Sequence, residues 1–127
     1  GVEFFVDKKG KVIFSELSPR PHDTGMVTMY TQNYSQFDIH ARVLLGLPLS
    51  GIKLDRPGAS HVILAEKNAT GNYSIAGIEK ALEDKSVDFR IFGKPFLKSY
   101  RRMGVILAET LDKAKIAAKK VTVRSHP

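Results

Sequence analysis

The feature that most constrains the fold is a turn sequence between two segments of high β-propensity at the start of the chain. Residues 1–6 and 11–17 are rich in β-branched and aromatic side chains, and residues 7–10, Asp-Lys-Lys-Gly, are typical of a turn. We therefore expect a β-hairpin with Glu3 on its first strand and Glu16 on its second. A two-residue loop would place the glutamates opposite each other and a four-residue loop would make them diagonal neighbours, whereas a three-residue loop with a bulge could part them.

Two carboxylates on one face of a hairpin need a compensating partner, because like charges that face each other across a strand pair are destabilising. A hard divalent cation with oxygen ligands is the usual partner. Glu3 and Glu16 are therefore candidate ligands of an Mg²⁺ ion that bridges phosphates. The alternative is that both glutamates lie on the solvated side of the hairpin, which is ordinary for charged residues.

The segment after the second strand is stiff and polar. Pro19 and Pro21 fix their own φ angles and favour extended conformations for the residues before them. The segment thus presents three polar side chains from a backbone with little freedom: Arg20, His22 and Asp23. The planar guanidinium of Arg20 suits a phosphate or a carboxylate, and Gly25 allows a close approach to the backbone. Proline-rich turns with an arginine are also common structural features.

These residues carry a resemblance to a known family. Residues 1–5 and 14–28, with the run Pro-Arg-Pro-His-Asp-Thr-Gly-Met at 19–26, resemble the end of the ATP-grasp domain of formate-dependent phosphoribosylglycinamide formyltransferases. The similarity continues through residues 37–48, which end in Leu-Gly-Leu-Pro. It resumes at two further places, Phe-Gly-Lys-Pro at 92–95 and Arg-Arg-Met-Gly-Val at 101–105, so it covers most of the chain.

Two related families differ from the chain at specific positions. The ATPase subunit of phosphoribosylaminoimidazole carboxylase shares Pro-Arg-Pro-His but typically continues with Asn, Ser and Gly. Asp23 and the Thr-Gly-Met that follows it favour the formyltransferase. More distant ATP-grasp enzymes often carry Asn where this chain has Ser18, which argues against a biotin carboxylase or a peptide-type ligase.

The resemblance implies an α+β fold class with two domains. Residues 1–55 would form the C-terminal portion of an ATP-grasp domain, from antiparallel strands and one helix. Residues 56–127 would form a small mixed α/β C-terminal domain. A chain of 127 residues has no counterpart of the upstream nucleotide-binding parts of such an enzyme, so we expect a C-terminal fragment that is inactive alone.

Local patterns predict the elements within each unit. In the first unit, Ser35 is expected to cap a helix that ends at Gly46. In the second unit, we expect strands at 60–65, 88–92, 103–108 and 121–123, a helix at 74–83 capped by Ser74, and a helix at 110–120 with inward Leu111, Ala114, Ala117 and Ala118. This βαββαβ order alone is typical of a ferredoxin-like fold, whereas the resemblance implies the small C-terminal domain.

The composition narrows the choice of partners. The formal net charge is +7, from 20 Lys and Arg against 13 Asp and Glu, which favours an anionic ligand. A phosphorylated metabolite explains this charge without a nucleic-acid motif, and non-specific polyanion binding is the alternative. The chain contains no cysteine, which excludes disulfides and thiolate metal sites. No apolar run approaches the roughly 20 residues of a membrane span.

A second group of candidate residues is basic. Lys94 follows one predicted strand, and Arg101 and Arg102 open the next, so three cations at one end of a hairpin would favour an anion. The alternative is a solvated basic loop. In the resembled formyltransferases, the positions that match Lys94, Arg101, Arg102 and Asp23 bind glycinamide ribonucleotide, and those that match Glu3 and Glu16 bind Mg²⁺.

The resemblance also implies a reaction. ATP would phosphorylate formate to formyl phosphate, and the amine of glycinamide ribonucleotide would then take the formyl group, in de novo purine biosynthesis. Arg20 is our candidate catalytic residue, as a further contact to a phosphate or the acyl phosphate. The family implies a cytoplasmic homodimer with no nucleic-acid or membrane partner. The alternatives are the carboxylase ATPase subunit and a non-enzymatic basic anion-binding module.

Overall fold

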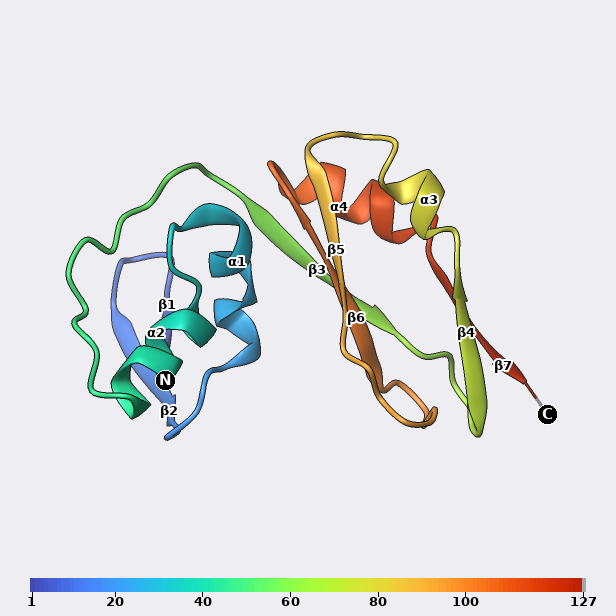
Figure 1. Cartoon of the computed structure of the whole chain (residues 1–127), viewed down its shortest axis with the longest axis horizontal. Helices are drawn as coiled ribbons and strands as arrows, with labels where there is room; N and C mark the ends of the chain where they lie inside the picture. The colour runs from blue at the N-terminus through green and yellow to red at the C-terminus, as the bar shows by residue number, and fades with distance from the viewer. Residues whose placement is uncertain (127) are drawn as a thin grey trace. The chain divides into compact units, whose positions relative to one another are not determined.

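A computed structural model of the chain describes residues 1–126 (Figure 1). The chain divides into two compact units, Gly1–Asp55 and Arg56–Pro127. In the described residues, the paired strands are antiparallel and the helices are nine residues long or shorter. This architecture confirms the expected α+β class.

The first unit begins with the predicted hairpin, formed by β1 (Val2–Val6) and β2 (Val12–Leu17). The chain reverses direction through a three-residue loop that Asp7 and Lys11 close. The Gly10 amide donates to the Asp7 carbonyl oxygen over 3.0 Å, and the Asp7 amide donates to the Lys11 carbonyl oxygen over 3.0 Å. Gly10 has a φ of +80°, which only glycine adopts without strain in such a turn.

Short helices follow the hairpin: η1 (Asp23–Val27), α1 (Thr28–Thr31) and α2 (Gln36–Leu44). The start of α2 is as predicted, because the Ser35 hydroxyl accepts a hydrogen bond from the Asp38 amide while the Asp38 carboxylate accepts one from the Ser35 amide. The Ser35 hydroxyl also donates to the Asp38 carboxylate over 2.6 Å, and this bond, together with the one from the Ser35 amide, holds the pKa of Asp38 below its usual value. The helix ends before Gly46, whose φ is +65°.

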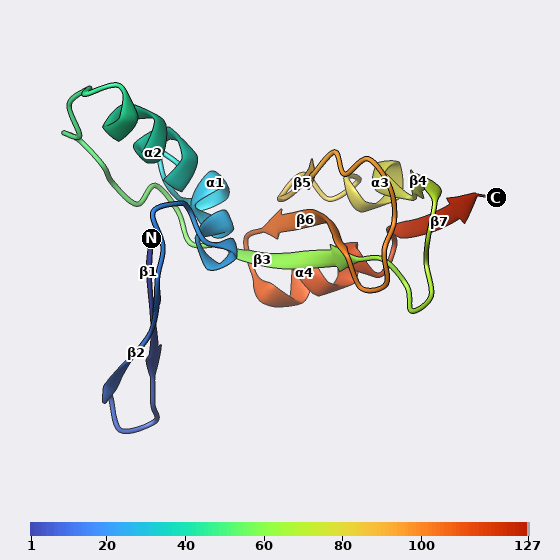
Figure 2. The ribbon, with the colours of Figure 1, turned by 90° about the horizontal axis from the view of Figure 1, so that it is seen from below.

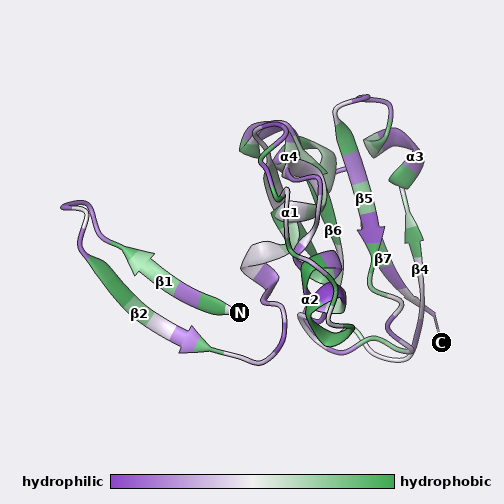
Figure 3. Cartoon of the chain, turned by 60° about the vertical axis from the view of Figure 1, so that its left-hand side comes forward, coloured by the Kyte–Doolittle hydropathy of each residue, from purple (hydrophilic) through white to green (hydrophobic). Residues whose placement is uncertain are grey.

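Hydrophobic residues run along both strands of the hairpin (Figure 3), and their side chains are exposed on both of its faces. Phe4 and Phe5 are consecutive and therefore point to opposite faces, yet they are 52% and 60% exposed. Phe4 and Phe14 meet edge to face, with their ring centroids 6.1 Å apart. The hairpin thus gains little stability from apolar burial within its own unit.

The second unit holds the hydrophobic core. A three-stranded sheet has the order β3 (Ala59–Leu64), β6 (Arg102–Ala108) and β5 (Val87–Ile91), and β4 (Asn72–Ala76) pairs with β7 (Thr122–His126). Helix α4 (Leu111–Ala118) lies along one face of the three-stranded sheet (Figure 2). Buried side chains of β6 and α4, among them Met103, Ile106 and Ala114, pack in one cluster.

Several predictions for the second unit are wrong. Residues 72–76 form β4 rather than the start of a helix. Within the helix predicted at 74–83, only the four residues of α3 (Ile78–Ala81) are helical. Ser74 is not a helix cap, because β4 pairs with β7 and sets Ser74 opposite Arg124. The extra strand and the second sheet also rule out the ferredoxin-like order. Leu111, expected to point inward, is 48% exposed.

The remaining predicted elements are confirmed with shifts of one to three residues at their ends. No helix within residues 1–126 has the length and the apolar character needed to cross a membrane.

Candidate functional site

Glu3 lies directly opposite Glu16 because two irregularities of the hairpin compensate for each other. The three-residue loop sets Phe4 opposite Phe14, and this register would place Glu3 opposite Ser15. A bulge between Glu3 and Phe4 shifts the register by one residue, so that Glu3 pairs directly with Glu16. The three-residue loop and the bulge that could have parted the two glutamates are therefore both present, and together they place the glutamates opposite each other.

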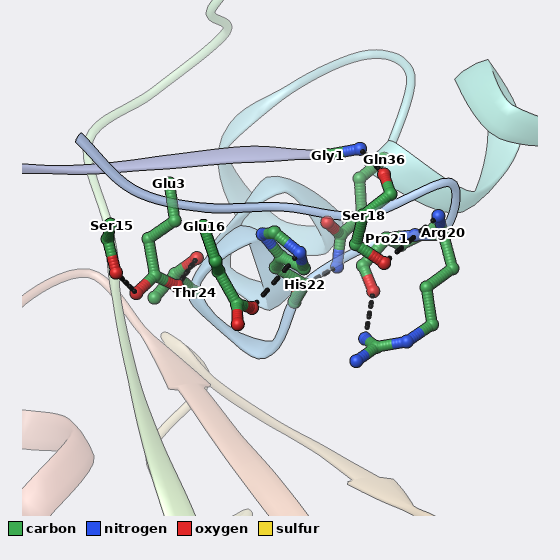
Figure 4. Close-up of polar contacts among 10 residues, drawn as sticks. All are labelled: Gly1, Glu3, Ser15, Glu16, Ser18, Arg20, Pro21, His22, Thr24 and Gln36. Atoms are coloured by element: carbon green, nitrogen blue, oxygen red, sulfur yellow. Dashed lines mark hydrogen bonds and ion pairs between the residues drawn. The ribbon is translucent and has the colours of Figure 1, made fainter.

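The two carboxylates lie in a cluster of polar side chains from three segments (Figure 4). Glu3 accepts hydrogen bonds from the hydroxyl groups of Ser15 and Thr24, each over 3.3 Å. The Oε1 atom of Glu16 lies 3.2 Å from Nε2 of His22. One ligand atom each of Glu3, Glu16 and His22 lies within 4.8 Å of the other two, a spacing that suits one metal ion. This donor set of two carboxylates and an imidazole fits a divalent cation.

His22 is the residue that sequence reasoning missed. The sequence places it in the stiff loop beside other polar residues, but the four histidines have no metal-ligand spacing, so no role followed. Its ring is buried, with 6% of the side chain exposed, and faces Glu16. The contact between His22 and Glu16 is seen only in the tertiary structure, because nothing in the local sequence requires the loop after β2 to turn back toward the hairpin.

Close approaches at two glycines fix the position of His22. Its carbonyl oxygen accepts hydrogen bonds from Nε2 of Gln36 over 2.7 Å and from the Gly25 amide over 3.1 Å. A Cβ atom on Gly25 would lie 2.0 Å from Oε1 of Gln36, and a Cβ atom on Gly1 would lie 3.2 Å from Nδ1 of His22. The close approach expected at Gly25 is thus made by the Gln36 side chain.

The other two predicted residues of this loop are exposed. Arg20 donates through Nη1 to the carbonyl oxygen of Pro21 over 3.1 Å, which leaves most of its five N–H donors for a ligand. Asp23 is the first residue of η1 and stands between His22 and Thr24 in the chain, two residues that contact the paired glutamates. Both residues belong to the loop that carries the cluster.

Lys94 lies on the loop between β5 and β6, and this loop is anchored at two points. The Tyr73 hydroxyl donates to the carbonyl oxygen of Lys94 over 2.5 Å. The amide of Leu97 donates to the carbonyl oxygen of Gly71 over 2.8 Å, and the Leu97 side chain is 1% exposed. The backbone that carries Lys94 is therefore held by β4 and by the core, while its own side chain is half-buried.

The two arginines after this loop are presented differently. Arg101 is the last loop residue; its Nη1 donates to the carbonyl oxygen of Phe96 over 3.0 Å, and its guanidinium carbon lies 5.1 Å from the centre of the Phe96 ring. Arg102 is the first residue of β6 and is exposed. The structure therefore brings Glu3 and Glu16 together, whereas the three basic residues belong to the second unit.

Comparisons with known proteins match both units. A family described as an ATP-grasp domain matches residues 1–37, and one described as PurT, C-terminal, matches residues 58–124. The formate-dependent phosphoribosylglycinamide formyltransferase of Synechococcus elongatus is 52% identical over 130 residues, which are 98% of this chain and 33% of the relative. That of Chlorobaculum tepidum is 58% identical over 108 residues, or 84% of this chain and 27% of the relative.

Solved structures of two differently named proteins are similar to the chain. The N5-carboxyaminoimidazole ribonucleotide synthetase from Thermotoga maritima superposes with a TM-score of 0.88 at 31% identity, over 98% of this chain and 36% of that one. The glycinamide-RNase-transformylase T from Mycobacterium tuberculosis gives a TM-score of 0.65 at 26% identity, over 94% and 30%. The chain spans about a third of the length of the relatives it matches. Residues 1–37, which precede the second match, are similar to the ATP-grasp domain family, and the chain belongs to the PurT C-terminal family.

Proposed function

We propose that this chain is part of a formate-dependent phosphoribosylglycinamide formyltransferase of purine biosynthesis. The observation that carries the proposal is the 52% identity, over 98% of the chain, to a relative of that name. Residues 1–55 would complete an ATP-grasp domain and residues 56–127 would form the C-terminal domain. The two family matches, which lie on either side of residue 56, support this division.

The paired glutamates provide the metal site in this proposal. Glu3 and Glu16 would hold Mg²⁺, which neutralises negative charge on the phosphates of ATP during phosphoryl transfer. Hydrogen bonds from Ser15 and Thr24 orient the Glu3 carboxylate toward its partner, as the outer partners of metal ligands do. A formate oxygen attacks the γ-phosphorus and ADP leaves. The amine of the ribonucleotide then attacks the formyl carbon, and phosphate leaves.

The remaining predicted residues would bind and orient the reactants. Asp23 would accept hydrogen bonds from the amine end of glycinamide ribonucleotide, and Arg20 would contact the transferred phosphate or the acyl phosphate. Lys94, Arg101 and Arg102 would bind the phosphate group of the ribonucleotide. The anchored backbone at Lys94 and the stacked guanidinium of Arg101 support this role, because preorganised cations lose less freedom on binding. The homodimer remains a prediction.

A second candidate is an N5-carboxyaminoimidazole ribonucleotide synthetase, since a protein of that name gives the TM-score of 0.88. The identity of 31% to that protein against 52% to the formyltransferase favours the first candidate. The test is ADP release by the full-length protein with Mg²⁺ and ATP. Formate with glycinamide ribonucleotide should support turnover, and bicarbonate with aminoimidazole ribonucleotide should not. Turnover with the second pair only would mean that the protein is a synthetase rather than a formyltransferase. Turnover with neither pair would favour the remaining alternative, a non-enzymatic basic anion-binding module.

A further inference from the structure

We propose that His22 is a third ligand of the cation site, which makes it a mixed carboxylate and imidazole site. Such a site would bind a divalent first-row transition cation, such as Co²⁺ or Zn²⁺, more tightly than it binds Mg²⁺. This inference rests on the metal site of the proposed function, and it adds a ligand and a cation preference that two glutamates alone would not give.

The buried nitrogen of His22 carries the argument. In the described residues, Nε2 is inaccessible to solvent and has no hydrogen-bond partner, although Oε1 of Glu16 lies 3.2 Å away. The two atoms are close enough for an ion pair but are not aligned for a hydrogen bond. A buried polar atom without a partner is costly, so native structures satisfy such atoms with a group, a water molecule or an ion. A cation that Glu3 and Glu16 also bind would satisfy Nε2.

The spacing of the three groups fits coordination of one ion. Ligand atoms at about 2.1 Å from a metal in adjacent octahedral positions are about 3 Å apart, and those in opposite positions are about 4.2 Å apart. The distance of 3.2 Å between Nε2 and Oε1 of Glu16 matches an adjacent pair. The ligand atom of Glu3 lies within 4.8 Å of the other two, so a small movement of a carboxylate is enough to bring all three onto one ion.

Two of the three ligands are also held in place before a cation binds. His22 is held through its carbonyl oxygen by Gln36 and the Gly25 amide, and its ring lies against Gly1. Glu3 is oriented by two hydroxyl groups. Glu16, 56% exposed, is the one ligand with freedom to adjust around an incoming ion. A rigid imidazole and a rigid carboxylate thus face a movable carboxylate.

The nitrogen ligand sets the preference among cations. Mg²⁺ is a hard cation that prefers oxygen ligands and retains several waters, so it gains little from an imidazole. Affinity of nitrogen-containing sites rises from Mn²⁺ through Co²⁺ and Ni²⁺, and imidazole is a good ligand for Zn²⁺. Removal of His22 should therefore affect the two classes of cation unequally.

The test is metal titration of the full-length protein without nucleotide, by calorimetry and by the visible absorption of bound Co²⁺. Two variants remove the imidazole: His22→Ala, and His22→Gln, whose side chain is closer to histidine in size. We expect both to weaken Co²⁺ binding at least tenfold and to shift the Co²⁺ absorption bands, but to change Mg²⁺ binding less than twofold. His40→Ala, which alters a partly buried histidine of α2, is the matched control and should behave as wild type. Circular dichroism checks the fold of each variant.

The outcomes separate this inference from the metal site itself. Equal losses of Co²⁺ and Mg²⁺ binding in both His22 variants would mean that His22 only orients Glu16, and unchanged Co²⁺ binding would mean that it has no role there. Either result overturns the inference. Glu16→Gln should abolish binding of both cations. If Glu16→Gln binds both as wild type does, the metal site of the proposed function fails as well.

Discussion

Replacement of Gly25 by alanine tests how the loop beneath the hairpin is held. The new Cβ atom would lie 2.0 Å from Oε1 and 2.6 Å from Cδ of Gln36, so the glutamine must rotate away from His22. The lost hydrogen bond of 2.7 Å costs about 1 kcal/mol, and overpacking adds about 1–3 kcal/mol. The better backbone propensity of alanine offsets about 1 kcal/mol, which leaves a net destabilisation of about 1–3 kcal/mol.

A double-mutant cycle isolates the clash. Gln36→Ala alone should cost about 1 kcal/mol for the lost hydrogen bond to the His22 carbonyl oxygen, which keeps its bond from the Gly25 amide. The double variant should cost no more than Gln36→Ala, because no side chain then opposes the new Cβ atom, so the two effects should fall short of additivity by about 1–3 kcal/mol. Hydrogen exchange of residues 22–36 in the full-length protein measures the local free energy of opening. Additive effects would refute the proposed role of Gly25.

Four further outcomes are expected. Arg102→Ala should raise the KM for glycinamide ribonucleotide roughly tenfold or more, as loss of a charged hydrogen bond does, and leave the KM for ATP unchanged; an equal rise in both contradicts the assignment. Glu16→Gln should strongly lower the Mg²⁺-dependent rate of ADP release, measured by metal titration, and an unchanged metal dependence would remove Glu16 from the metal site. Tyr73→Phe should raise the KM for the ribonucleotide several-fold at constant kcat, because the hydroxyl anchors the Lys94 backbone. Ser35 lowers the pKa of Asp38, so the hydrogen bonds between them should stabilise α2 fully above the unfolded pKa of Asp38 near 3.8. This stabilisation should be lost as the pH falls through the lowered pKa of the folded state, and hydrogen exchange of the α2 amides measures the loss.

Local chemistry in the sequence was sufficient for the elements whose signals lie within a few residues. The turn at residues 7–10 predicted the hairpin, and Ser35 with Asp38 predicted the start of α2, because a turn and a capping box are each satisfied by neighbours in the chain. The candidate metal pair, Glu3 and Glu16, also followed from the sequence. The family resemblance, which the matches over residues 1–37 and 58–124 confirm, came from short runs of specific residues.

Contacts between distant segments decided the rest. Ser74 has the sequence signal of a helix cap, but pairing with a strand about fifty residues later makes it part of β4. Glu3 and Glu16 lie opposite each other because a bulge offsets the register that the three-residue loop sets. A register depends on both strands together, so neither strand's sequence shows it alone. His22 joins them only because Gln36 and two glycines hold its loop beneath the hairpin. The sequence by itself predicted the candidate residues other than His22, and the tertiary structure decided which of them meet, because strand register and burial arise only once distant parts of the chain pack against each other.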